Sequence, residues 1–169
     1  MRRLPLLVPV IGVLFLAGSA YAADFVAAPL NGGDEVPPNA SKAHGTATFT
    51  VSEDGSSVDY KLVVANINNV TAAHIHIGAV GVNGPVVVLL FGNAPAGGGP
   101  SNGVLAQGTF TAANLSGPLV GQPLSALLTE MQAGNTYVNV HTNDGVSPPN
   151  TGPGDFPGGE IRAQIRPDE

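Results

Sequence analysis

Turn-forming residues interrupt this sequence so often that few segments are long enough to form a helix. The chain has 169 residues, of which 23 are glycine and 15 are proline, and the runs between them are rich in Val, Ile, Thr and Phe. Short runs of this kind, bounded by turn signals, are typical of the strands of a β-sandwich or barrel. We therefore expect an antiparallel all-β fold.

Alternation of apolar and polar residues places the individual strands. Gly45 to Ser52 and Ser57 to Val64 alternate on either side of Glu53-Asp54-Gly55, which is a strong hairpin signal. The continuous apolar run Val86 to Phe91 indicates a strand buried on both faces. Further strands are expected at residues 25–30, as an edge strand, and at 71–78, 104–111, 136–142 and 160–166.

One short helix and two long loops complete this pattern. Four apolar residues between Leu124 and Met131 recur at helical spacing, and Gly134 follows them, which predicts a glycine-capped helix near 124–133. Gly92 to Asn102 and Asn143 to Gly159 are rich in glycine and proline and are expected as loops. Long ordered loops are often functional.

Residues 1–22 have the features of a secretory signal peptide. Two arginines precede an apolar run from Leu4 to Ala17, and Ala20-Tyr21-Ala22 provides a small-residue cleavage site. Cleavage would leave residues 23–169 as one domain, in which no apolar run approaches the roughly 18–20 residues that cross a bilayer. We therefore expect a periplasmic or extracellular protein that does not insert into the membrane after cleavage.

The charge and the missing cysteines exclude several kinds of partner and site. Twelve acidic residues against six basic ones argue against nucleic acid and anionic membranes as partners, because both are bound by clustered Lys and Arg. A chain without cysteine has no disulfide, thiolate metal site or thiol nucleophile. Neither a serine-hydrolase elbow nor a phosphate-binding loop is present, and we predict no catalytic residues.

Three of the four histidines occur in two strand-like segments. His74 and His76 are two residues apart, so on a strand their side chains point to the same face, about 6–7 Å apart along the backbone. His141 lies in a second such segment and would complete a three-nitrogen metal site if the two strands are neighbours. All-imidazole sites suit copper or zinc rather than magnesium or calcium. Because imidazole must be neutral to coordinate, binding is expected to fade below about pH 6.

Alternatives remain open for these histidines and for the polar residues near them. The three histidines could instead be hydrogen-bonded to the backbone and serve packing alone. His44 is either a fourth ligand or a solvated residue at a strand end. Three acidic residues are candidates for orienting a histidine by accepting its second ring proton, or are solvated or structural groups: Asp144, Asp155 and Glu160.

Arg162 has two interpretations of its own. It follows Glu160 by two residues, so both side chains point to the same face of a regular strand and could form a structural pair. Arg162 could otherwise attract an anion toward the metal.

Four separated motifs occur in order along the chain. They are Glu35-Val36-Pro37-Pro38, Ala73-His74-Ile75-His76-Ile77-Gly78, Gly134-Asn135-Thr136-Tyr137-Val138-Asn139-Val140-His141-Thr142 and Gly158-Gly159-Glu160-Ile161-Arg162. In this arrangement the chain resembles the CHRD domain family, named for modules in chordin and found also in exported bacterial proteins. The likeness spans about Asp24 to Ile165. It departs at Ala163, where the family usually has glycine.

A second resemblance is to the copper/zinc superoxide dismutases, β-barrels whose copper is held by a His-x-His pair and a distant histidine. His74 and His76 match that pair and His141 matches the distant ligand. This likeness implies a Greek-key sandwich or barrel and a copper site. Because no histidine lies between His76 and His141, the bridging and zinc ligands have no counterparts, and no zinc site is expected.

The sequence thus favours an exported protein that binds one copper ion through His74, His76 and His141, for copper storage, delivery or redox chemistry at the cell envelope. We expect a binding protein rather than an enzyme, although a three-histidine site keeps a position open at which superoxide could react. The alternative is a non-catalytic adhesion or matrix module that uses its long loops to bind an extracellular protein, since loops on rigid β scaffolds often carry recognition. The oligomeric state is left undetermined.

Overall fold

A computed structural model describes residues 24–92 and 94–168, and the predicted signal peptide at 1–22 lies outside this part of the chain. In the described residues the strands form an antiparallel sheet in the order β5-β4-β7-β8-β1-β2-β3-β6, and β9 pairs with β1. The strands are β1 (Asp24–Asn31), β2 (His44–Val51), β3 (Ser57–Asn68), β4 (Val70–Ile77), β5 (Val86–Phe91), β6 (Pro100–Thr111), β7 (Thr136–Thr142), β8 (Ile161–Gln164) and β9 (Arg166–Pro167).

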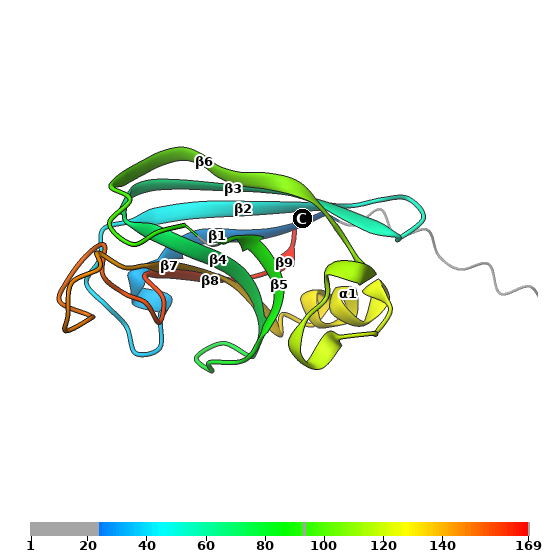
Figure 1. Ribbon diagram of the computed structural model, residues 1–169. Helices are drawn as coiled ribbons and strands as arrows, with labels where there is room; N and C mark the ends of the chain where they lie inside the picture. Colours follow the sequence, from blue (N-terminus) through cyan, green and yellow to red (C-terminus); the bar gives the residue numbers. More distant parts are fainter. Residues whose placement is uncertain (1–23, 93, 169) are drawn as a thin grey trace, which may run out of the picture.

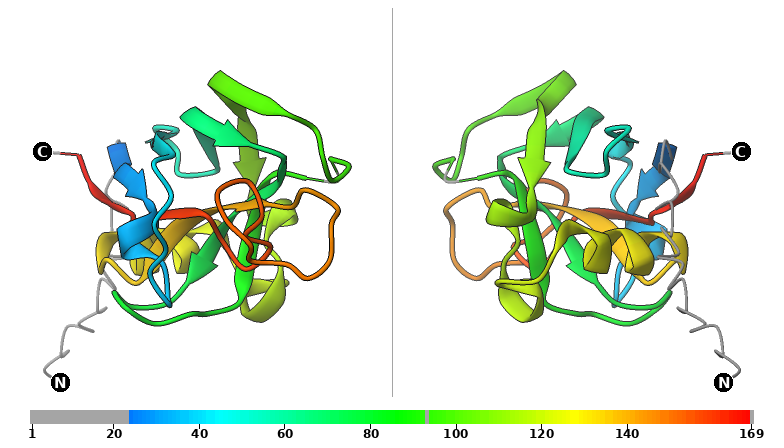
Figure 2. Two further views of the ribbon diagram at one scale, coloured as in Figure 1. Left: turned by 90° about the vertical axis from the view of Figure 1, so that its left-hand side faces the viewer. Right: turned by 90° about the vertical axis from the view of Figure 1, so that its right-hand side faces the viewer.

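The sheet folds over on itself into two layers. β1, β2, β3 and β6 form one layer and β4, β5, β7 and β8 the other (Figure 1). β5 and β6, at the two ends of the strand order, contact each other, so the barrel is nearly closed, as the end views show (Figure 2). β7 pairs with β4 although β5 and β6 lie between them in sequence, which is a Greek-key connection. The predicted all-β Greek-key class is confirmed.

Side-chain alternation decides which residues fill the barrel. On β4, Ala73 and Ile75 point into the core and are fully buried, so the histidines between and beside them point to the outer face. On β7, Val138 and Val140 are fully buried in the same core. The side chains that alternate with them therefore share the outer face of this layer with those of β4.

The predicted helix is present at one end of the barrel. α1 (Leu124–Gln132) buries three apolar side chains against the core, and Gly134 follows it with a φ of +70°, a conformation that favours glycine. At nine residues, this α-helix of the described chain is too short to span a membrane. The described residues also include three short 3-10 helices, at Gly32–Asp34, Ala112–Asn114 and Gly117–Leu119.

Two strand predictions are wrong because they depend on neighbours that the sequence pattern does not show. β1 is not an edge strand, since it pairs with β2 on one side and with β8 and β9 on the other. β5 is not buried on both faces. It pairs only with β4 along its length, and Leu89 is 54% exposed on its outer side.

Other strands differ from the prediction in their bounds. β6 begins at Pro100, so the glycine-rich loop is shorter than expected, and β3 continues to Asn68. The last predicted strand, 160–166, is divided into β8 and β9 because Ile165 bonds back to Thr136 between them.

Glu160 attaches two loops to the barrel. Its carboxylate is fully buried and accepts hydrogen bonds from the Ser41 hydroxyl, from Thr142 Oγ1 at 2.6 Å and from the backbone N–H of Gly154 at 2.9 Å. These donors come from the loop before β2, from the end of β7 and from the loop before β8. The acid thereby fixes both loops against the outer face of the sheet.

We expect Glu160→Gln to lower the free energy of unfolding by about 1–3 kcal/mol, because an amide NH₂ cannot accept one of these hydrogen bonds and leaves a buried donor unpaired. Urea denaturation measures the change. Glu53→Gln, in the exposed β2–β3 turn, is the matched control and should have no effect. Equal stabilities of the two variants would show that Glu160 does not anchor the loops.

Candidate metal centre

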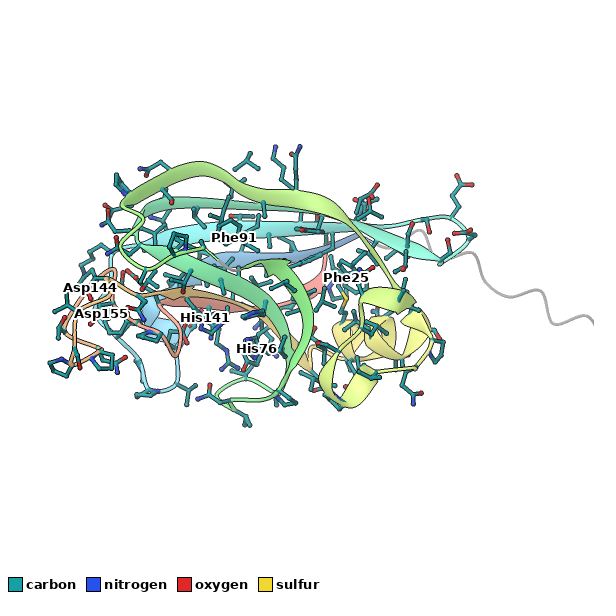
Figure 3. All side chains as sticks on the ribbon, in the orientation of Figure 1. Phe25, His76, Phe91, His141, Asp144 and Asp155 are labelled. Atoms are coloured by element: carbon teal, nitrogen blue, oxygen red, sulfur yellow. The ribbon has the colours of Figure 1, made fainter. Side chains whose placement is uncertain are left out.

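Three histidines meet on the outer face of the β4–β7 pair. The register pairs His74 with Asn139 and His76 with Tyr137, and it places His141 opposite Ala72. One ring nitrogen of each histidine lies within 4.8 Å of the others. The ring centres are 5.0–5.8 Å apart, and His76 and His141 lie together on the side of the layer that faces away from β2 and β3 (Figure 3). The structure therefore brings together the three histidines that the sequence singles out.

The hydrogen bonds of two of these rings determine which nitrogen is free. His76 Nδ1 is 2.9 Å from the carbonyl oxygen of Gly84, and His141 Nδ1 is 3.0 Å from that of Pro157. A carbonyl oxygen can only accept, so in each neutral ring Nδ1 carries the proton and Nε2 keeps its lone pair.

The free nitrogens are buried without partners. His74 Nδ1, His76 Nε2 and His141 Nε2 are each inaccessible to solvent and have no hydrogen bond. Buried polar atoms are normally paired, and an unpaired group costs about 1–3 kcal/mol, so three of them at one place call for a common partner. One ring nitrogen from each of the three histidines also lies within 4.8 Å of the others, a spacing that fits a metal ion that accepts nitrogen ligands.

The environment keeps all three imidazoles neutral. Burial lowers the pKa of each, because it disfavours the charged form. The neighbouring histidines lower the pKa of His74 and His141 further, and the guanidinium of Arg162 does the same for His76. The pKa of His141 falls to about 4. The rings are therefore ready to coordinate at neutral pH, and the loss of binding expected near pH 6 from ordinary imidazole moves to lower pH.

The backbone acceptors come from loops that cover the outer face. Gly84 lies in the β4–β5 connection, where a Cβ would stand 1.7 Å from the carbonyl oxygen of Ile77, so only glycine fits. Its backbone N–H donates to the Tyr137 hydroxyl at 3.0 Å, which helps to position the residue whose carbonyl oxygen accepts a hydrogen bond from His76. Pro157 belongs to the proline-rich loop between β7 and β8. Both loops thus help to build the site.

The other candidate ligand and the candidate carboxylates do not join the cluster. His44 is exposed at the start of β2, with Nδ1 3.4 Å from the Lys42 carbonyl oxygen. The three acids bond elsewhere: Asp144 accepts from the Val146 N–H, Asp155 from Thr151, and Glu160 from Ser41, Thr142 and Gly154. Backbone carbonyls, not carboxylates, orient His76 and His141.

Arg162 has neither of the roles considered from the sequence. Its side chain is only 2% exposed and donates to Asn83 Oδ1 at 3.1 Å and to the carbonyl oxygens of Ala79 and Val82 at 3.2 and 2.9 Å. It is therefore not paired with Glu160. Nor is it a free surface cation that could attract an anion toward the metal. It holds the β4–β5 loop against the sheet.

Tyr137 is a site residue that the sequence reasoning missed. Its ring stacks on that of His76, with centres 4.9 Å apart and planes at 11°, and the guanidinium carbon of Arg162 lies 3.4 Å from its centre. Alternation on β7 would have found it, because residues 137, 139 and 141 share one face.

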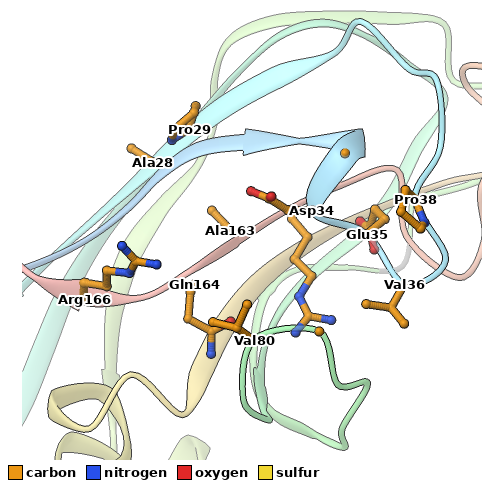
Figure 4. Close-up of a pocket in the computed structure, with 13 residues that line it drawn as sticks. Ala28, Pro29, Asp34, Glu35, Val36, Pro38, Val80, Ala163, Gln164 and Arg166 are labelled. Atoms are coloured by element: carbon orange, nitrogen blue, oxygen red, sulfur yellow. The ribbon is translucent and has the colours of Figure 1, made fainter.

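Glu35 lies beside this group at the edge of a cavity of about 510 Å³. Asp34, Val80 and Gln164 also line the cavity (Figure 4). The carboxyl of Glu35 is 4% exposed, and Asn139 Nδ2 donates to it at 3.4 Å. Burial raises its pKa to about 7, although the Arg162 cation acts in the opposite direction. The folded chain therefore brings Glu35, the first residue of the motif Glu35-Val36-Pro37-Pro38, close to the sheet face that carries the histidines. The position of the motif in the sequence does not reveal this.

The model of the CHRD domain family matches residues 26–149, a span that includes all three clustered histidines, Glu35 and Tyr137. No curated protein matches the chain.

The depressed pKa of His141 predicts how the metal-free protein responds to acid. In the unfolded chain this histidine gains a proton near pH 6.5, whereas in the folded protein it does so near pH 4, so its contribution to stability is present above pH 6.5 and is lost as the pH falls toward 4. We expect the stability advantage of the wild type over His141→Gln to shrink by about 2 kcal/mol between pH 7 and pH 4.

Urea denaturation with a chelator present measures this difference. The raised pKa of Glu35 has the opposite effect on stability, since its contribution is lost as the pH rises through 7, but it is common to both proteins and cancels. A difference that stays constant with pH would contradict the prediction.

Proposed function

This chain belongs to the CHRD domain family, and we propose that it is an exported protein that binds one copper ion through His74, His76 and His141. The observation that supports the proposal is the convergence of three histidines from two paired strands, each of which also has one buried ring nitrogen without a hydrogen-bond partner among the described residues. The task would be copper storage, copper delivery or redox chemistry at the cell envelope.

Copper is the ion that this ligand set favours. Imidazole nitrogen suits copper and zinc, and copper(II) stands above zinc in the general order of divalent affinities. The ligands are neutral, so the site brings no carboxylate of the kind that magnesium or calcium would need. A three-ligand site also leaves a coordination position for water, a substrate or a ligand from a delivery partner, which suits an ion that has to enter and leave.

Export is proposed from the sequence alone. The basic start, the apolar run and the small-residue cleavage site within residues 1–22 have the pattern of a signal peptide. A histidine site in a chain without cysteine would keep its ligands in an oxidising compartment, where thiols are lost to disulfides.

The competing proposal, an adhesion or matrix module, rests on the long loops. In the structure the loop between β7 and β8 contributes Pro157 to the histidine site and is tied to Glu160 through Gly154. These contacts give the loop a role in building the site, and they favour metal binding as its purpose.

We expect the mature protein to bind one equivalent of copper and the His74→Ala/His76→Ala variant to bind at least 100-fold more weakly, because two of three nitrogens are removed. Titration with a competing chelator measures the affinities. His44→Ala is the control and should bind as the wild type does. Equal uptake by the wild type and the double variant would exclude this site.

Copper should also raise the melting temperature, because the three-histidine site exists only in the folded state. With the pKa values of all three histidines lowered, and that of His141 at about 4, we expect the rise at pH 7.5 to persist at pH 5.5 and to disappear near pH 4. Thermal melts with and without cupric ion test this. His141→Ala should show no rise at any pH, and an undiminished rise in that variant would mean that copper binds elsewhere.

A further inference from the structure

We infer that the buried positive charge of Arg162, held against His76 through the ring of Tyr137, biases the three-histidine site toward the cuprous ion over the cupric ion. This inference rests on the proposed copper function and adds to it the oxidation state that the site prefers.

The three side chains form a stack across neighbouring strands. His76 on β4 is directly opposite Tyr137 on β7, and Arg162 comes from β8, which pairs with the other side of β7. The His76 ring is nearly parallel to that of Tyr137 at 4.9 Å, and the guanidinium lies 3.4 Å from the centre of the same ring. Because the two partners approach from opposite sides of β7, Tyr137 lies between them.

The charge of Arg162 is poorly screened by water. The side chain is 2% exposed, and its hydrogen bonds go to the neutral oxygens of Asn83, Ala79 and Val82. Two acids line the same cavity as Arg162. Asp34 is exposed to solvent, and burial raises the pKa of Glu35 to about 7, so Glu35 offsets the guanidinium only in part at neutral pH.

The histidine ligands carry no negative charge that would offset the repulsion between Arg162 and a bound copper ion. Three neutral imidazoles leave the bound ion with its full charge, and the second nitrogens of His76 and His141 bond to neutral carbonyls. A fixed cation nearby repels a doubly charged ion more than a singly charged one.

The test compares the affinities of the mature protein for the two copper ions. Cuprous affinity is measured without oxygen against a cuprous chelator, and cupric affinity against a cupric chelator. We expect Arg162→Gln, which keeps a hydrogen-bond donor and removes the charge, to lower the preference for the cuprous ion about tenfold. For a one-electron couple this corresponds to a fall of about 59 mV in the reduction potential.

Two variants separate charge from packing. Arg162→Lys keeps the charge and should retain the preference within a few-fold, although it loses the planar contact with Tyr137. Arg166→Gln removes the same charge from an exposed position on β9 and should leave the preference unchanged. An unchanged preference in Arg162→Gln would overturn the inference, as would an equal fall in Arg162→Lys.

A third variant keeps the inference testable if Arg162→Gln does not fold. Glu35→Gln leaves the guanidinium in place and removes the acid that offsets it, so the cuprous preference should rise above that of the wild type at pH 8.5. No rise would count against a role for the charge. A wild-type protein that binds neither ion would instead overturn the proposed copper function itself. If the protein binds copper but its cuprous preference does not depend on Arg162, only the inference fails.

Discussion

Strand alternation in the β4–β7–β8 layer is the constraint from which the rest of the site follows. Where the side chain of a strand residue such as Ile75 or Val138 points into the core, the side chains of its neighbours in the sequence point to the opposite face. The core therefore fixes the positions of His76, Tyr137 and Arg162 as firmly as it fixes its own apolar side chains. A row of polar groups results on a sheet face that would otherwise be open to water.

The loops convert this polar face into a buried site. The β4–β5 connection supplies the carbonyl of Gly84, and the loop before β8 supplies that of Pro157. Each loop is in turn held by a buried charged side chain, the first by Arg162 and the second by Glu160. Burying these ionic groups costs desolvation energy, which the hydrogen bonds with their neutral partners have to offset. Here they determine where the loops lie, and thereby which histidine nitrogens stay free.

Local patterns in the sequence were sufficient to predict most strands, the helix and the three candidate histidine ligands. They were not sufficient to predict which residues surround those histidines. The His74/His76 spacing, the helix before Gly134 and the strand at 136–142 each follow from periodicity within a few residues. Tyr137 was within reach of the same reasoning. The role of Glu35 was not, because about a hundred residues separate it from Asn139 and only the folded barrel brings them together. The misplacement of β1 at an edge has the same cause, since strand neighbours are a property of topology rather than of local composition.

The pairing of β4 with β7 also determines when an ion can be captured. His141 lies 65 residues after His76, and β5, β6 and α1 all lie between β4 and β7 in the chain, so the pairing of these two strands closes a long loop. Before that pairing forms, β4 can pair with β5 and offers only the two histidines of its own strand. One nitrogen from each of the three histidines is in place only when β4 and β7 are paired, so the complete site is a property of the folded barrel and not of any single segment.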